Sequence, residues 1–328
     1  MLRSMYSGIS GLKNFQTKLD VIGNNIANVN TYGFKKERTV FKDLISQTQA
    51  GASSPSATRG GVNAIQVGLG SQLAAIDTMH TPGSMQSTGR TLDLAISGDG
   101  FFMVADSAAE ELPAVEDMAS ITENALIDEE LTNTQYTRAG NFYMDRNGFV
   151  VNGDGKYLVG YANPEIYGEV DPDGESLADA DKETAAEELG QDNLYEDGAI
   201  TVDTRAIKIP TNAQSMSISK DGSIYYVDVN GKLQFAGQAI LAKFPNASGL
   251  EKTGSNYFQV TANSGDPLVQ VGTQAGIGSV ESSFLEMSNV DLSEEFTEMI
   301  VAQRGFQANS RIITTSDEIL QELVNLKR

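Results

Sequence analysis

Residues 292–326 read LSEEFTEMIVAQRGFQANSRIITTSDEILQELVNL, and their spacing decides the fold. Large apolar residues recur every seven positions, at Leu292, Met299, Phe306, Ile313 and Leu320. The companion positions of this repeat are only partly apolar, namely Phe296, Gln303, Ser310, Asp317 and Val324. The pattern predicts an amphipathic helix with a half-polar seam. Asp291 or Ser293 is expected to cap its start, and the acidic Glu294, Glu295 and Glu298 suit the first turns because the helix dipole favours negative charge there.

The opening segment of the chain carries a matching stripe. Apolar and small residues alternate at intervals of three and four, at Leu2, Met5, Ile9, Leu12, Gln16, Leu19, Gly23 and Ile26. This spacing predicts a second amphipathic helix. Because both stripes contain polar or small members, two such helices would hold each other only weakly, and partner molecules would complete the packing. The stripes could equally cover a sheet within a compact monomer.

The middle of the chain is rich in strand and turn signals. Alternating or β-branched runs occur at residues 91–96, 101–104, 136–144, 149–151, 206–209, 216–218, 223–229, 233–235 and 239–244. Turn dipeptides such as Asn147-Gly148, Asp154-Gly155, Asp221-Gly222 and Asn230-Gly231 separate them and supply positive φ for tight hairpins. None of these glycines fits a phosphate-binding motif. The pattern predicts an antiparallel sandwich or small barrel, so the fold class is α+β.

The acidity of the chain is local. The formal net charge is -21, yet residues 106–135 and 163–203 hold more than half of the 44 acidic residues and a single base, Lys182. Their mixture of like charges with Pro and Gly is typical of solvated loops. The run at residues 171–175, DPDGE, places oxygens close together as in a calcium site, but its spacing fails the EF-hand pattern.

Composition excludes several classes of function. The chain of 328 residues has no Cys and one His, His80, which is expected in a turn, so thiolate sites, multi-His metal sites and most triads are ruled out. A pI near 4.3 opposes nucleic-acid binding. We expect no enzyme activity, no cofactor and no metal. The start lacks the apolar run of a cleaved secretory signal and no stretch suits membrane insertion, so any export is expected to use another route.

Short motifs near both ends resemble one known family, the bacterial flagellar hook and rod proteins. Residues 23–34, GNNIANVNTYGF, followed by Lys35 and Lys36, are similar to the signature that closes the family's first helix. Residues 287–292, 300–309 and 319–326 resemble its closing helix, and residues 87–102, STGRTLDLAISGDGFF, resemble its middle. The paired end motifs are specific, and the resemblance leaves only the acidic inserts unaccounted for.

The resemblance implies a structural role. It implies that the two terminal helices pair as a coiled-coil-like bundle lining a helical tube of many copies, with the β-rich domain outside. It also implies export through the flagellar type III apparatus, contact with other axial proteins (rod, hook cap and hook-filament junction), and a place outside the cell in the hook or basal body. The ends look most like the hook protein of Gram-positive bacteria, which acts as a flexible joint between motor and filament. The distal rod protein is the alternative.

These expectations assign residues to roles. The subunit interface is expected at Leu2, Met5, Ile9, Leu12, Leu19, Ile26, Leu292, Phe296, Met299, Phe306, Ile313 and Leu320. The family motif falls on Asn24, Asn25, Asn28, Thr31, Gly33 and Phe34, and it is expected to form the helix exit. There, Asn28 or Asn30 would bond the backbone and Gly33 would take positive φ.

The domain boundaries follow from the same reasoning. The helical assembly domain is expected to be discontinuous, and the Gly, Ser and Ala content of the segment after the first helix is typical of a flexible or extended connector. The ranges are residues 1–43 and 285–328 for the helical domain, 44–75 for the connector and 76–284 for the β-rich domain, with acidic inserts at 106–135 and 163–203. Two other functions remain open: a calcium-binding acidic surface protein and a membrane-surface helix protein.

Overall fold

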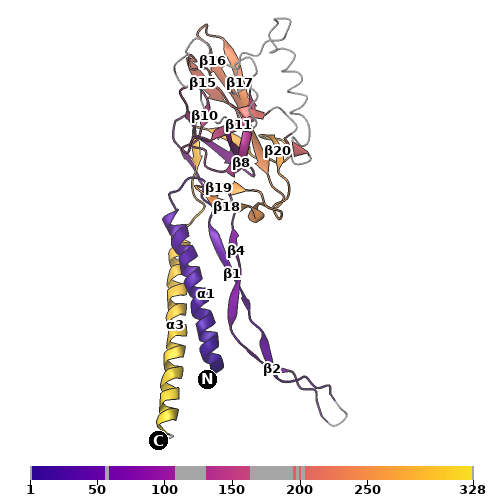
Figure 1. Ribbon diagram of the computed structural model, residues 1–328, viewed down its shortest axis with the longest axis vertical. Helices are drawn as coiled ribbons and strands as arrows, with labels where there is room; N and C mark the ends of the chain where they lie inside the picture. The colour runs from indigo at the N-terminus through magenta and orange to yellow at the C-terminus, as the bar shows by residue number, and fades with distance from the viewer. Residues whose placement is uncertain are drawn as a thin grey trace. The chain divides into compact units, whose positions relative to one another are not determined.

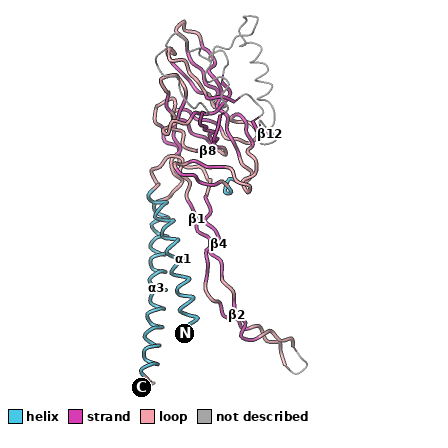
Figure 2. Tube along the Cα trace, viewed as in Figure 1, coloured by secondary structure: helices cyan, strands magenta, loops and turns pink. Residues whose placement is uncertain are grey.

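The computed structural model describes residues 2–55, 59–107, 131–162, 195–196, 199–200 and 204–326. The chain forms two compact units. Unit 1 comprises Met1–Val29, Lys35–Met79 and Val290–Arg328, and unit 2 comprises Asn30–Phe34 and His80–Asn289. The long helices belong to unit 1 and most strands to unit 2, so the α+β class is confirmed (Figure 2). Most of the two acidic inserts, and with them the calcium hypothesis, lies outside the described residues.

Both predicted terminal helices are present. Helix α1 spans Leu2–Ala27 and helix α3 spans Leu292–Asn325, and they run antiparallel, side by side, in unit 1 (Figure 1). Asp291 caps α3 as the sequence predicts, because its side chain accepts hydrogen bonds from the backbone N–H groups of Ser293 and Glu294, at 2.8 and 3.4 Å. This cap satisfies amide groups that the first helical turn leaves without partners.

The segment after α1, for which the sequence predicts a flexible or extended connector at residues 44–75, is extended and is paired as strands. Strand β1 (Glu37–Asp43) pairs with β4 (Ser71–Thr78), and β2 (Ser46–Ala50) pairs with β3 (Ile65–Gly68). Together they form one long antiparallel ribbon in unit 1, in which β1 and β4 lie against α1 (Figure 1). Its Gly and Ser content hid the pairing, because the hydrogen bonds of a ladder come from the backbone and need no apolar side chain.

Unit 2 is built on an antiparallel sheet of 12 strands among the described residues. Its main path runs β15-β16-β17-β11-β7-β8-β19-β18. These strands are β15 (Ser215–Ile218), β16 (Ser223–Val227), β17 (Leu233–Lys243), β11 (Tyr157–Ala162), β7 (Phe101–Ser107), β8 (Leu131–Thr137), β19 (Tyr257–Gln259) and β18 (Glu251–Gly254). The strands that pair beside the path are β9 (Tyr143–Met144), β10 (Val150–Val151), β14 (Thr204–Ala206) and β20 (Leu268–Val271).

Three short antiparallel pairs accompany the sheet. They are β21 (Ser279–Ser282) with β6 (Leu94–Ser97), β22 (Phe284–Glu286) with β5 (Met85–Ser87), and β12 (Tyr195–Glu196) with β13 (Ala199–Ile200). A short 3-10 helix spans Ala247–Gly249. The predicted hairpin turns are present, since Gly148, Gly155, Gly222 and Gly231 all take positive φ.

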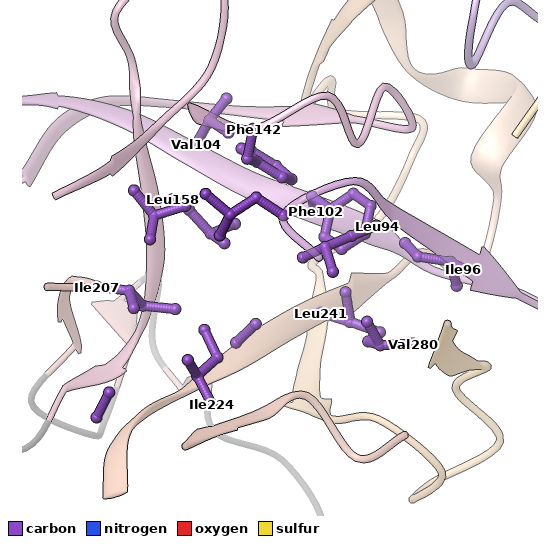
Figure 3. Close-up of a cluster of buried hydrophobic side chains, with 14 of the residues drawn as sticks. Leu94, Ile96, Phe102, Val104, Phe142, Leu158, Ile207, Ile224, Leu241 and Val280 are labelled. Atoms are coloured by element: carbon purple, nitrogen blue, oxygen red, sulfur yellow. The ribbon is translucent and has the colours of Figure 1, made fainter. Parts of the chain in front are cut away.

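Both faces of the central strands of unit 2 are buried. On β7, Phe102 and Val104 point into one apolar cluster, which Figure 3 shows, while Phe101 and Met103 point into a second. Strand β17 alternates in the same way, with Leu241 in the first cluster and neighbouring side chains in the second. A sheet with large side chains packed on both faces gains much of its stability from apolar burial.

Two details of the strands depart from the sequence prediction. The runs expected at residues 233–235 and 239–244 form one continuous strand, β17, and the run at 136–144 is split between β8 and β9. Gly237 lies within this strand, and an added Cβ there would lie 2.6 Å from the carbonyl oxygen of Tyr161 on β11. Glycine therefore marks a close approach of two strands at this position.

The unit boundaries also differ from the predicted domains. Residues 30–34 and 285–289 belong to unit 2, because the backbone N–H of Gly33 donates to the carbonyl of Glu286 at 2.8 Å. His80 opens the main stretch of unit 2. It lies outside the strands but not in an assigned turn, and its ring meets those of Phe101 and Phe258 edge-on at 5.5 and 5.4 Å.

Candidate assembly surface

Helices α1 and α3 contact each other through small residues. An added Cβ at Gly305 would lie 2.5 Å from the ring of Phe15, and one at Gly11 would lie 2.6 Å from the side chain of Asn309. A Cβ at Gly8 would meet Ile313 at 3.3 Å. Positions that increase along α1 thus face positions that decrease along α3, which fixes the antiparallel register. We call this contact the seam.

The seam buries little apolar surface. Its members on α3 follow a three-and-four spacing, at Glu295, Glu298, Ala302, Gly305, Asn309, Ile313, Ser316 and Leu320. Most of them are small or polar, and Ala302 and Ser316 are buried. Small side chains let two helix backbones approach closely but remove little apolar area from water. The helices pack side by side as expected, yet mostly through other residues than the predicted apolar stripes, of which Ile313 and Leu320 alone are shared with the seam.

The predicted stripe of α1 lies one residue past the seam. The seam uses Gly8, Gly11, Phe15, Lys18 and Ile22, whereas the stripe uses the next positions, Ile9, Leu12, Gln16, Leu19 and Gly23. One residue turns an α-helix by about 100°, so the stripe faces sideways. Periodicity predicts which residues of α1 share one side of the helix, but it does not show which side meets α3. The helices meet at small residues because glycine and alanine allow a closer approach than leucine does.

Several of the stripe's apolar side chains remain accessible. Ile9 of α1 is 51% exposed, and Met5, Leu12, Leu19 and Ile26 are half-buried. On α3, Leu292, Phe296 and Phe306 are exposed and Met299 is half-buried. Ile313 and Leu320 lie at the seam and are half-buried, and the side chain of Leu2 lies outside the described residues.

The two stripes lie on one side of the helix pair. On α3, Phe296, Met299 and Phe306 each follow a seam residue by one position, as Ile9 and Leu12 do on α1. A rotation of 180° about an axis perpendicular to the plane of the two helices exchanges the helices of an antiparallel pair. Residues that follow a seam residue by one position therefore point to the same face of the pair on both helices. We call this surface the front face. It comprises Met5, Ile9, Leu12, Leu19 and Ile26 of α1 with Leu292, Phe296, Met299 and Phe306 of α3.

Asn25 links three elements of unit 1. Its side chain donates to the carbonyl of Glu37 at 2.9 Å and accepts from the Glu37 N–H at 3.0 Å, so it pairs with the first residue of β1 as a strand would. The same Nδ2 donates to Oε2 of Glu295 on α3, at 3.2 Å. Asn25 is 1% exposed. It therefore fixes where the ribbon and α3 begin relative to α1, a role that the prediction of a helix exit missed.

Opposite charges meet in the first turns of α3. Lys36 Nζ lies 2.8 Å from a carboxylate oxygen of Glu294 and 3.9 Å from Glu295, and Lys18 lies 3.0 Å from Glu298. The hydrogen bond with Glu294 raises the pKa of Lys36, while burial raises the pKa of Glu295. The sequence assigned these acids to the helix dipole alone. Their ion pairs with Lys18 and Lys36 could be found only when the two ends of the chain are placed side by side.

The remaining motif residues divide between the units. In unit 1, the Asn28 side chain donates to both the carbonyl and the side-chain oxygen of Asn24, at 2.9 and 3.0 Å, and closes the last turn of α1. In unit 2, Gly33 takes the predicted positive φ of 69°, and a Cβ there would lie 2.6 Å from the Ala139 nitrogen.

Thr31 and Phe34 complete the motif in unit 2. The carbonyl of Thr31 accepts a hydrogen bond from the backbone N–H of Phe34 at 3.4 Å, which closes a turn around Gly33. Phe34 is buried beneath the ammonium of Lys252, 5.1 Å from the ring centroid. The expected helix exit is thus a helix end in unit 1 followed by a turn anchored in unit 2.

The described residues contain no cluster of three or more metal-ligating side chains. Within the same residues, no helix is long and apolar enough to cross a membrane. The surface of unit 1 carries a helix pair with a narrow seam, an apolar front face beside the seam and a ribbon packed against α1. An exposed apolar face of this kind is typical of a structural subunit that binds other protein surfaces.

Comparison with known proteins agrees with that class. Residues 5–35 match the family described as flagella basal body rod protein, and residues 281–326 match the C-terminal region of the flagellar basal body rod FlgEFG proteins. Residues 127–226 match the D1 domain of flagellar hook protein FlgE/F/G.

Full-length relatives place the chain more closely. It is 49% identical over 330 residues to flagellar basal-body rod protein FlgG of Bacillus subtilis, with both chains fully covered. It is 34% identical over 441 residues to flagellar hook protein FlgE of Borreliella burgdorferi, again with full coverage of both. Rod protein FlgG of Buchnera aphidicola from Acyrthosiphon pisum is 32% identical over 330 residues, covering 99% of this chain and 100% of the relative.

The chain belongs to the flagellar hook and rod protein family, and it is a structural component of the bacterial flagellum. Proteins of this family polymerise and associate with other axial components of the flagellum. The comparisons favour the rod alternative over the hook that the sequence predicted. Identity to the Bacillus rod protein is higher. That alignment covers 330 residues, close to the 328 residues of this chain, whereas the alignment with the hook protein extends over 441 residues.

Proposed function

We propose that this chain is a subunit of the flagellar distal rod, the drive shaft of the basal body, and that it polymerises through the front face of its helix pair. Full-length identity of 49% to a rod protein supports the rod. The observation that carries the assembly surface is the front face itself, where Phe296 and Phe306 are 50% and 38% exposed. Large apolar side chains gathered on one side of a helix pair mark an interaction surface.

The front face supplies energy that the seam lacks. Complete burial of one large apolar side chain is worth about 1.5 to 3 kcal/mol, and each side chain of this face has part of its area left to bury. Several such side chains act together when a neighbouring copy covers them. Assembly therefore stabilises the helices more than their contact with each other does.

This arrangement couples ordering of the chain ends to assembly. A helix pair held mainly through small and polar residues, with only a few apolar contacts, is marginal in isolation, since a single helix in water gains little from propensity alone. Burial by neighbouring copies then shifts the equilibrium towards the paired helices by mass action. A chain whose ends order only on assembly is also suited to export in an incompletely folded form through the flagellar type III apparatus.

Unit 2 supplies the remaining contacts. Its sheet is stabilised from within, so it can fold before assembly and present a fixed outer surface to its neighbours in the axial structure. The partners that we propose are further copies of this chain, adjoining rod and hook subunits, and cap and junction proteins that share the same axis. The hook is the second candidate, favoured by the full-length match to a hook protein, and it would require the outer units to slide.

One substitution and its matched control test the front face. Phe306→Glu places a charge within the face, and Gln307→Glu places the same charge on the next, exposed residue of α3. Sedimentation and negative-stain electron microscopy should show tubes for the wild type and for Q307E, and monomers for F306E with unit 2 still folded. Straight tubes favour the rod and curved ones the hook. Tubes of normal length from F306E would contradict the proposal.

A further inference from the structure

A second apolar strip lies on the opposite side of α3 from the front face. It consists of Val301, Ile312, Ile319 and Leu323, which are 58%, 45%, 43% and 48% exposed. The first three each precede a seam residue by one position, namely Ala302, Ile313 and Leu320. We call it the rear strip.

The side of the pair follows from helix geometry. A displacement of one residue before the seam turns the side chain about 100° in the direction opposite to the front face. On α1 the same backward displacement gives Ser7, Ser10 and Asn14. The ribbon packs on that side, because Asn14 Nδ2 donates to Ser71 Oγ at 2.8 Å and a Cβ at Gly70 would meet the Ser10 side chain.

The rear of the helix pair is thus covered unequally. On α1 the ribbon covers the small and polar side chains, whereas on α3 four large apolar side chains keep about half of their surface in water. Front and rear are both apolar but differ in sequence, shape and neighbours. A twofold symmetric dimer would need only one such surface, whereas a polymer that keeps growing needs two different ones.

We propose that the rear strip receives the front face of a second copy of this chain, so that each subunit docks front to rear between two neighbours. The inference rests on the proposed assembly function and adds the identity of the second surface. Family members polymerise, and the helix pair has two apolar sides. The contact is heterologous, with Phe296 and Phe306 of one copy against Ile312 and Ile319 of the next.

The absence of Cys from the sequence makes a crosslinking test free of background. Single variants F306C and I312C and the double variant F306C/I312C are assembled and exposed to a mild oxidant, and the products are separated without reductant. The double variant should give a ladder of covalent multimers, and a mixture of the two single variants should give mainly heterodimers. F296C and I319C are used in the same combinations, so that a front-to-rear contact displaced along α3 is also detected.

Three outcomes would overturn the proposal. One is homodimers from F306C or F296C alone, which would mark a symmetric front-to-front contact. Another is the absence of front-to-rear crosslinks in all four combinations within sedimented polymer. The third is equal crosslinking of I312C with the control Q307C, since Gln307 lies on neither surface.

Poisoning of growth provides a second readout. I312E retains an intact front face, so a small fraction of it should dock on a growing end and stop elongation of the wild type. The double variant F306E/I312E should have no effect. Polymer of normal length from I312E alone would overturn the rear strip while leaving the front face intact, and failure of the wild type to polymerise would instead reject the proposed function.

Discussion

Unit 1 and unit 2 use opposite kinds of interior. In unit 2, Phe102 and Leu241 are completely buried in a cluster that occupies one face of a sheet whose other face is also packed. In unit 1, small and polar residues make up most of the contact between the helices, with a few apolar members such as Phe15 and Ile313, and most of the large apolar residues lie beside it, partly in contact with water. The difference supports the proposal that unit 2 is stabilised by its own core, whereas unit 1 is completed by neighbouring copies.

A matched pair of Phe→Ala substitutions gives the largest expected contrast. Phe102→Ala removes a fully buried ring and should destabilise unit 2 by about 3 to 5 kcal/mol. Phe296→Ala removes a half-exposed ring from α3 and should change the stability of the monomer by less than about 0.5 kcal/mol. Urea denaturation of the monomer, followed by circular dichroism, measures both. Equal losses would remove the contrast between the units.

The tether at Asn25 should have the next largest effect. Asn25→Ala leaves the Glu295 carboxylate and the Glu37 backbone without their partner in a buried place, at a cost of about 1 to 3 kcal/mol. Asn24→Ala, one residue earlier, is the control and should cost much less, because it removes only an exposed hydrogen bond from Asn28. The helical signal of the assembled polymer in rising urea reports the loss. Identical unfolding midpoints for the two variants would rule out a tether.

Two Gly→Ala substitutions should change the stability of the helix pair in opposite directions, and together they test how closely the seam is packed. Alanine normally stabilises an exposed helix position by about 0.5 to 1 kcal/mol, and Gly23→Ala should do so because nothing lies within 4 Å of the added methyl group. Gly305→Ala should destabilise the helix pair by about 1 to 2 kcal/mol, because the methyl group meets the Phe15 ring at 2.5 Å. The same urea measurement on polymer applies, and stabilisation by both variants would show that the helices are not closely packed.

The smallest expected effect is a dependence on pH. Burial raises the pKa of Glu295, so over the interval between its unfolded and folded pKa values the folded chain binds more protons and the stability of unit 1 increases as the pH falls. The pKa of Lys36 is raised by its bond with Glu294, so its contribution is present below the unfolded pKa and is lost as the pH rises through the folded pKa.

Glu295→Gln isolates the acidic part of this dependence. The variant should remove the increase in polymer stability on the acid side and leave the alkaline loss unchanged. Lys36→Met should do the reverse. The urea midpoint of the polymer, measured from pH 4 to 11 in steps, reports both, and an unchanged acid profile in E295Q would contradict the assignment to this carboxyl group.

Much of the fold could be predicted from local sequence, and the failures share one cause. The helices follow from the spacing of Met299, Phe306 and their equivalents, and the cap from Asp291. The hairpins of unit 2 follow from dipeptides such as Asn230-Gly231. Each of these signals lies within a few residues of the structure that it specifies, so it can be recognised without knowledge of the rest of the chain.

The missed features depend on contacts between distant segments. The ribbon at residues 37–78 is held by backbone pairing with no apolar pattern of its own, and the seam by glycines whose role appears only when Gly305 meets Phe15. Asn25 bonds Glu295, which is 270 positions away. The residues of the front face were predicted as a subunit interface, but periodicity alone could not show that α1 and α3 meet each other mostly through other residues.

Amide hydrogen exchange of the monomer and of the polymer tests most directly whether unit 1 is completed by neighbours. Amides of α1 and α3 should exchange rapidly in the monomer and become protected in the polymer, whereas amides of β7 and β17 should be protected in both. Strong protection of α1 and α3 in the monomer, equal to that of β7 and β17, would contradict the completion of unit 1 by neighbours.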